Sequence, residues 1–193
     1  MPKVGLNTDA VIAAALAEID EHGFGALTIA AVARRCGVAA PSLYKHVRDV
    51  AELRRHATRA VLHDVADHLI PAVTGRSGYE ALSGLMRAWR EYALTHPNRY
   101  ATLVNDVLHD ATTKDAAARL LTVLLAVLEG YGLTGSAAIH QARCIRSAVH
   151  GFVSLEAGGG FGLPEDLDIS FERLINMVTS SLASSAPFRR DAW

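Results

Sequence analysis

The sequence is poor in cysteine and in aromatic residues, and it carries almost no net charge. Its two cysteines, Cys36 and Cys144, lie far apart and lack the spacing of a zinc site, so we expect reduced thiols rather than a disulfide framework. No signal peptide opens the chain, and its most apolar stretch, 120–128, is too short to span a bilayer. These absences exclude the usual secreted and membrane classes, and we expect a cytoplasmic protein.

Signatures of common enzymes and metal sites are also missing. The sequence has no Gly-x-Ser-x-Gly motif and no paired-carboxylate site, and the glycine-rich stretch 158–162 lacks the Lys-Ser/Thr of a phosphate-binding loop. Nine histidines leave a metal-responsive protein as an alternative, because His56 and His63, and likewise Asp64 and His68, each share a helical face. We expect no enzymatic activity, no cofactor and no metal.

What is present favours helices throughout. Half of the residues are hydrophobic, alanine and leucine abound, and runs of strand-forming residues are scarce, so we predict an all-α fold without a sheet. A boundary inside the long fourth helix gives two predicted domains, a three-helix domain at 1–60 and a larger helical domain at 61–193. The spacing of apolar and capping residues predicts helices at 8–22, 28–36, 41–47, 49–69, 79–95, 99–109, 114–131, 136–156 and 170–184.

Charge is distributed unevenly along the chain. Residues 28–59 contain seven basic and two acidic residues, a local net charge of +5, whereas the whole chain has a net charge of −1. The remaining residues therefore sum to −6. Such a local excess is typical of a protein that binds nucleic acid with one face.

The basic segment has the proportions of a helix-turn-helix. Thr28 is expected to cap the first of its helices, Gly37 to turn the chain, and Pro41 to begin the second. Burying Leu43 and Val47 leaves hydroxyl, imidazole and cationic groups outward for phosphates and base edges. These outward groups belong to Ser42, Tyr44, Lys45, His46 and Arg48. The alternative is an ordinary three-helix packing unit whose surface is merely charged.

The order of these residues resembles the N-terminal domain of the tetracycline-repressor (TetR) family of regulators. The resemblance covers the first third of the chain, and it is closest in the run Pro41-Ser42-Leu43-Tyr44-Lys45-His46-Val47. The pair His150-Gly151 looks like the remnant of a motif found in one C-terminal subgroup. The other matching positions are Leu27-Thr28-Ile29, Val32-Ala33, Cys36-Gly37-Val38 and Leu53.

The resemblance implies a role for each matching position. Thr28 would contact one phosphate and Tyr44 another. Bases or the adjacent backbone would be approached by Pro41, Ser42 and His46. Lys45 and Arg48 would add electrostatic attraction to the phosphates. Two departures matter, because the family often has lysine where Val50 stands and a polar residue where Ala30 stands. They keep open a second alternative, a helical interaction protein that has lost DNA binding.

The two final helices each carry one broad apolar stripe. The resemblance implies a homodimer in which these helices from two subunits form a four-helix interface. The alternative is that both stripes face the core of their own chain. The predicted interface residues are Ile145, Val149, Val153, Phe171, Leu174, Ile175 and Val178.

Between the two ends lie apolar residues suited to a small-molecule cavity, although most of them are expected to be ordinary core. Trp89, Tyr92 and His150 would supply polar or stacking contacts. We expect an apolar or amphipathic effector that shifts the long fourth helix and so releases a repressor from a palindromic operator. The predicted cavity residues are Met86, Trp89, Tyr92, Leu103, Val107, Leu125, His150 and Phe152.

Overall fold

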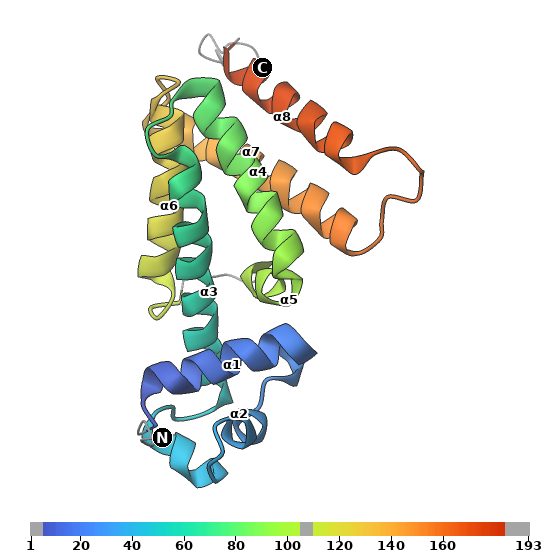
Figure 1. Cartoon of the computed structure of the whole chain (residues 1–193). Coiled ribbons are helices and arrows are strands. Elements are labelled where there is room, and N and C mark those ends of the chain that lie inside the picture. Colours follow the sequence, from blue (N-terminus) through green and yellow to red (C-terminus); the bar gives the residue numbers. More distant parts are fainter. Residues whose placement is uncertain (1–5, 105–109, 184–193) are drawn as a thin grey trace, which may run out of the picture. The chain divides into compact units, whose positions relative to one another are not determined.

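A computed structural model describes residues 6–104 and 110–183, and every element within these ranges is a helix (Figure 1). The all-α prediction is therefore confirmed. Contacts divide the chain into two compact units, one made of residues 1–67 with 92–120 and the other of residues 68–91 with 121–193. In chain order the elements, with η for 3-10 helices, are α1 Thr8–His22, η1 Phe24–Ala26, α2 Ile29–Arg35, η2 Ala40–Lys45, α3 Val50–Val73, α4 Gly78–Thr95, α5 Pro97–Tyr100, η3 Ala101–Val104, α6 Lys114–Glu129, α7 Gly135–Ala157 and α8 Leu167–Ala183.

The first helices begin and end at residues suited to these positions. Asn7 caps α1, because the Asn7 side chain accepts a 2.8 Å hydrogen bond from the Ala10 N–H. Thr28 caps α2 as predicted, with 3.1 Å between its hydroxyl oxygen and the Ala31 nitrogen. Gly37 follows α2 with a φ of 68°, which confirms the predicted left-handed stop.

The second helix of the helix-turn-helix is shorter and tighter than predicted. Instead of an α-helix of almost two turns from Pro41, the chain forms the 3-10 helix η2, in which Ser42 N–H donates to the Ala39 carbonyl at 2.9 Å. Leu43 and Val47 are buried as predicted. They join the residues of α1, α2 and early α3 in one core, whose buried members are Val11, Ala15, Ile19, Leu27, Val32, Ala33, Leu43, Val47, Leu53 and Ala57.

The long helix α3 starts as predicted but ends later. Asp49 accepts the Glu52 N–H at 2.7 Å, and Glu52 in turn accepts the Arg48 N–H at 2.6 Å, which is close to a capping box. The predicted helix ends at residue 69, yet α3 continues through Pro71 to Val73. A proline so near the end removes only one backbone bond, and Arg76 donates to the last carbonyls, at 2.6 Å to that of Ala72.

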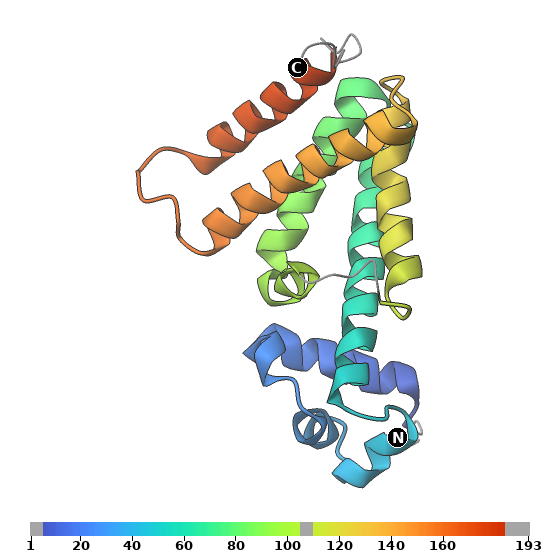
Figure 2. The same cartoon turned by 180° about the vertical axis from the view of Figure 1, so that it is seen from behind.

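Residues 97–104 belong to the first unit together with α1 and most of α3. Where one helix over 99–109 was predicted, the structure has α5 followed by the 3-10 helix η3, and residues 105–109 lie outside the described ranges. Within this unit α5 packs against α1 (Figure 2). The chain therefore returns to its first helix after α4.

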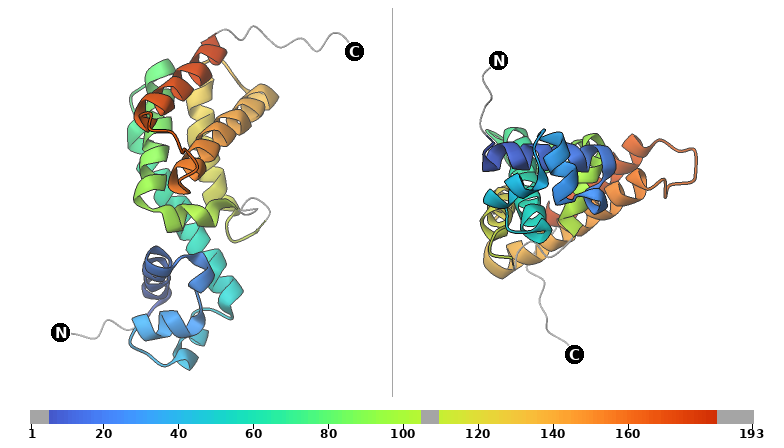
Figure 3. Two further views of the ribbon diagram at one scale, coloured as in Figure 1. Left: turned by 90° about the vertical axis from the view of Figure 1, so that its right-hand side faces the viewer. Right: turned by 90° about the horizontal axis from the view of Figure 1, so that it is seen from below.

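In the second unit, α8 lies beside α4 (Figure 3). Arg87 of α4 forms a bidentate pair with Glu172 of α8, with nitrogen-oxygen distances of 2.6 and 2.7 Å. Arg90 binds Glu156 of α7 at 2.6 Å and Asp168 of α8 at 2.7 Å. The loop of residues 158–166 that joins α7 to α8 projects beyond the ends of both helices (Figures 1 and 2).

Candidate nucleic-acid interface

The outward face of η2 is polar and accessible. Tyr44 is 57% exposed, Pro41 and Lys45 are also exposed, and Ser42 and His46 are half-buried. Because Leu43 and Val47 fix the opposite side in the core, this face cannot turn inward without exposing apolar surface. The structure thus brings five of the predicted DNA-contacting residues onto one short surface, which we call the η2 face.

Cations of the first unit differ in their availability. Lys45, Arg34 and Arg59 are exposed, and no carboxylate within the described residues lies within ion-pair distance of them. Arg48 is also exposed, but its guanidinium lies 3.0 Å from Glu52, and this pairing holds the pKa of the Glu52 carboxyl below its usual value. Of the two cations predicted to grip phosphates, Lys45 is therefore ready and Arg48 is engaged.

Ion pairs hold α2 against α1. The Arg35 Nε donates to the buried carboxylate of Glu18 at 3.0 Å, and the same guanidinium binds Glu21. This hydrogen bond to Arg35 lowers the pKa of Glu21. His22 also lies 3.3 Å from Glu18. The orientation of α2, whose N-terminus carries Thr28, therefore depends on charges at the C-terminal end of α1.

A second arginine from the body of the first unit holds the same end of α1. Arg99 binds both carboxylate oxygens of Asp20 at 2.7 Å and reaches Asp64 of α3 at the same distance. Asn98 donates to the Asp20 carbonyl at 2.9 Å, and the Tyr92 hydroxyl donates to Asp64 at 3.2 Å. We call Asp20, Asp64, Tyr92, Asn98 and Arg99 the α1 clamp. Sequence analysis did not predict it.

The predicted effector residues are divided between the two units. Tyr92 and Leu103 belong to the first unit and are buried, whereas Met86 and Trp89 are buried in the second. Leu125, His150 and Phe152 are half-buried in the second unit, and Val107 lies outside the described residues.

Two of these residues have chemically distinctive surroundings. The Phe152 ring lies 5.0 Å from that of Phe171 and 4.9 Å from that of Phe161, measured between centroids. Burial lowers the pKa of His150, and the charge of Arg146 lowers it further. His150 is consequently neutral at neutral pH and suited to hydrogen bonding rather than to ion pairing.

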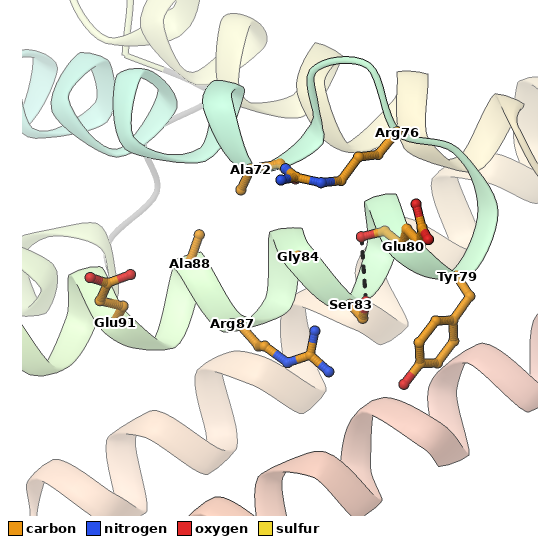
Figure 4. A pocket seen from close by; sticks show the side chains of 9 residues that line it. All are labelled: Ala72, Arg76, Tyr79, Glu80, Ser83, Gly84, Arg87, Ala88 and Glu91. Atoms are coloured by element: carbon orange, nitrogen blue, oxygen red, sulfur yellow. Dashed lines mark hydrogen bonds between the residues drawn. The ribbon is translucent and has the colours of Figure 1, made fainter.

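A surface pocket that the sequence did not predict lies in the second unit (Figure 4). It has a volume of about 560 Å³, and its lining comes from α4, the end of α3 and the turn between them. Its arginines are already engaged, Arg76 by the end of α3 and Arg87 by Glu172. None of the predicted effector residues lines it. Its lining consists of Ala72, Arg76, Tyr79, Glu80, Ser83, Gly84, Arg87, Ala88 and Glu91.

The predicted dimer residues mostly face their own chain. Five of the seven are at most 1% exposed, and the other two, Leu174 and Val178, are half-buried. The buried five are Ile145, Val149, Val153, Phe171 and Ile175. These five side chains are enclosed by their own chain, and the opposite side of α7 and α8 is exposed. That side includes three large exposed apolar residues, Leu155, Ile169 and Met177.

Other site types find little support in the described residues. Across 6–104 and 110–183, no three His, Cys, Asp or Glu side chains gather in a way that could hold a metal ion. Asp64 and His68, part of the metal alternative, contact Arg99 and Glu91 instead. Within the same ranges no helix is long and apolar enough to cross a membrane.

Known proteins resemble this chain in both sequence and fold. The chain is 36% identical over 169 residues to Rv0681 of Mycobacterium tuberculosis, an uncharacterised HTH-type transcriptional regulator, a match that covers 84% of this chain and 74% of the relative. It is 31% identical to another such regulator, YobS of Bacillus subtilis, over 94% of this chain and 95% of the relative. The TetR-Q116A structure from Acinetobacter baumannii, solved with minocycline, shares the fold with a TM-score of 0.72 at 19% identity, covering 97% of this chain and 100% of that one.

Family assignments agree with these relatives. Residues 11–57 match the bacterial regulatory proteins of the tetR family, and residues 82–178 match a tetracyclin repressor-like C-terminal domain. The first match contains α2, η2 and the start of α3, and it therefore includes the η2 face. The chain belongs to the TetR family of transcriptional regulators.

Proposed function

We propose that this chain is a ligand-responsive repressor that binds a palindromic operator as a homodimer. The observation that carries the proposal is the η2 face, on which Tyr44 and Lys45 are exposed while Leu43 and Val47 anchor the element in the core. Thr28, Ser42 and His46 lie on or beside this surface and supply hydrogen-bonding groups. A bacterial regulator of this kind acts in the cytoplasm, where its DNA lies.

Dimerisation supplies what one small helix-turn-helix lacks. Two recognition elements must meet successive major grooves about 34–36 Å apart. We place the contact surface on the exposed side of α7 and α8, where Leu155, Ile169 and Met177 are each at least half exposed. Ile169, Arg173 and Met177 recur at intervals of four residues, so they share one face of α8.

Release by a ligand follows from the continuity of α3. Residues 50–67 of this helix belong to the first unit and residues 68–73 to the second. An effector that prefers one arrangement of the far end of α3 would tilt the η2 face and change the spacing of the two recognition elements. Met86, Trp89, His150 and Phe152, all in the second unit, remain the proposed contacts for an apolar or amphipathic molecule. The minocycline in the Acinetobacter structure is an effector-sized ligand of that protein.

The DNA-binding step is tested with the duplex immediately upstream of the gene for this chain. Replacing Tyr44 and Lys45 together by alanine should weaken binding to all sequences and lower the slope of log K against log salt by about one. Lys114→Ala is the matched control, because Lys114 is exposed at the start of α6, outside the helix-turn-helix. Equal binding by the double variant and the wild type would reject the η2 face as the site.

Base reading is tested at Ser42. If Ser42 reads a base edge, Ser42→Ala should relax sequence preference by about 1–3 kcal/mol at one position of the operator. A loss that is uniform over all operator variants would make Ser42 a backbone contact instead.

The dimer surface is tested by light scattering after gel filtration. Met177→Glu should give a monomer, because it places a charge in the proposed apolar contact. Leu94→Glu is the control, because Leu94 is also a large apolar residue at the surface, 41% exposed, but lies on α4. A dimer that survives Met177→Glu but not Leu94→Glu would overturn the placement.

One observation favours a second candidate, a helical interaction protein that has lost DNA binding. Arg48 is paired with Glu52, and Val50 stands where the family often has lysine, so two cations expected at phosphates are absent or engaged. Binding of the wild type to the upstream duplex and to a random pool of duplexes separates the two candidates. Failure of the wild type to bind any DNA at 50 mM salt would favour this second candidate.

A further inference from the structure

Arg54 of α3 holds the segment that leads into α2. Its guanidinium carbon lies 5.6 Å from the centre of the Phe24 ring, and its Nη2 donates to the carbonyls of Gly25 at 3.4 Å and Leu27 at 3.3 Å. The residue after Leu27 is Thr28, which caps α2. Arg54 therefore contacts both ends of the short path from η1 to the cap.

Packing and short-range backbone hydrogen bonds hold this segment in addition to Arg54. None of the η1 residues is buried, and η1 has no side-chain cap. Leu27 is buried and Phe24 packs on the core, but the backbone carbonyls of residues 25 and 27 point to Arg54. Arg54 therefore adds a restraint on the backbone that leads into Thr28, beside the buried Leu27 and the ion pairs of Arg35 that hold α2.

An apolar side chain would serve packing alone better than arginine. The Nε of Arg54 is buried and has no hydrogen-bond partner within the described residues, which costs free energy. A methionine or leucine could cover Phe24 without leaving a donor unpaired. Unlike such a side chain, arginine can hold the carbonyls of Gly25 and Leu27.

We propose that Arg54 is a positioning residue for DNA binding, which acts through Thr28 and does not itself contact the duplex. The inference rests on the proposed function, in which Thr28 binds a backbone phosphate. Arg54 fixes the backbone on which the cap is built, so that the Thr28 hydroxyl and the first turn of α2 meet the phosphate without further ordering.

A double-mutant cycle on the upstream duplex tests this inference. Arg54→Met should weaken binding roughly five- to tenfold, the loss expected when one hydrogen-bonding cap is misplaced. In a Thr28→Ala background the same change should have almost no further effect. Arg54→Lys keeps the charge but cannot span both carbonyls, so it should bind with intermediate affinity.

Salt dependence separates positioning from direct contact. Positioning predicts an unchanged slope of log K against log salt in Arg54→Met, whereas a direct phosphate contact predicts a slope smaller by about 0.9. Arg59→Met is the control, because it removes the same charge from an exposed site further along α3. Amide exchange at Ala31 reports the cap without DNA, and its protection should fall in Arg54→Met and partly in Arg54→Lys.

The outcomes are separable. If the wild type binds the duplex but the Arg54 and Thr28 effects add, or the salt slope falls, the positioning role is overturned while the proposed function stands. If the wild type binds no DNA, the proposed function fails and this inference fails with it. Should Arg54→Met not fold, Arg54→Lys carries both the affinity and the exchange measurements.

Discussion

The α1 clamp allows a stability prediction of some precision. Arg99→Met removes the group that joins α1 to α3 and leaves Asp20 and Asp64 without their shared cation. The Arg99 side chain is 19% exposed, but those of Asp20 and Asp64 are 37% and 45% exposed, so water restores part of the lost interaction. Charged hydrogen bonds are each worth about 1.5–3 kcal/mol when protected, and after this discount we expect a total loss of about 2 kcal/mol.

Urea denaturation followed by circular dichroism measures this loss directly. A destabilisation of about 2 kcal/mol corresponds to a fall in melting temperature of roughly 4–8 °C for a chain of this size. Arg119→Met is the matched control, because Arg119 pairs with Asp67 at 2.6 Å but both side chains are well exposed, 40% and 64%. It should cost less than about 0.5 kcal/mol. Equal losses in the two variants would refute the view that the clamp is a protected network.

Three further predictions concern other parts of the chain. Glu52→Gln should raise DNA affinity and steepen the slope of log K against log salt by up to about 0.9, because it frees the Arg48 guanidinium. The amide oxygen of glutamine can still accept the Arg48 N–H. An unchanged slope would place Arg48 away from phosphates. A Cβ at Gly84 would lie 2.7 Å from a carbonyl oxygen of α3, so Gly84→Ala should cost about 1–3 kcal/mol in urea unfolding, whereas Gly151→Ala, with open space around it, should gain about 0.5–1 kcal/mol. Burial holds the pKa of His150 below 6.5, so the unfolded chain binds more protons than the folded chain as the pH falls. The stability contribution is therefore complete above pH 6.5 and is lost as the pH drops toward the folded pKa. His150→Gln should flatten this part of the curve of unfolding free energy against pH.

The sequence predicts local features of this fold well. Thr28 and Gly37 act through atoms within four residues of themselves, and the structure has this cap and this turn where the sequence places them. The inward spacing of Leu43 and Val47 is equally local. The helix at Pro41 was assigned the wrong type, because hydrophobic spacing over six residues does not distinguish α-helical from 3-10 hydrogen bonding.

Long-range charge pairs escape such reading. Arg54 donates to the carbonyls of Leu27 and Gly25, which lie 27 and 29 positions earlier in the chain. Arg99 binds Asp20 across 79 positions. No pattern in the sequence marks either contact. An apolar stripe also leaves its partner unspecified. The stripes that include Ile145 on α7 and Phe171 on α8 are compatible with an interface or with a core. Only the packing of α4, α7 and α8 shows that these side chains are enclosed.

The first compact unit is assembled from two separate stretches of chain, and this has a consequence for engineering and for gene fusion. A hybrid regulator joined at residue 60 would give α1 a foreign partner in place of Arg99 and Asn98, and its acidic end would meet whatever side chains the donor body supplied. Recombination that preserves the recognition head must therefore carry residues 92–120 with it, so the transferable module is discontinuous in the gene although compact in space.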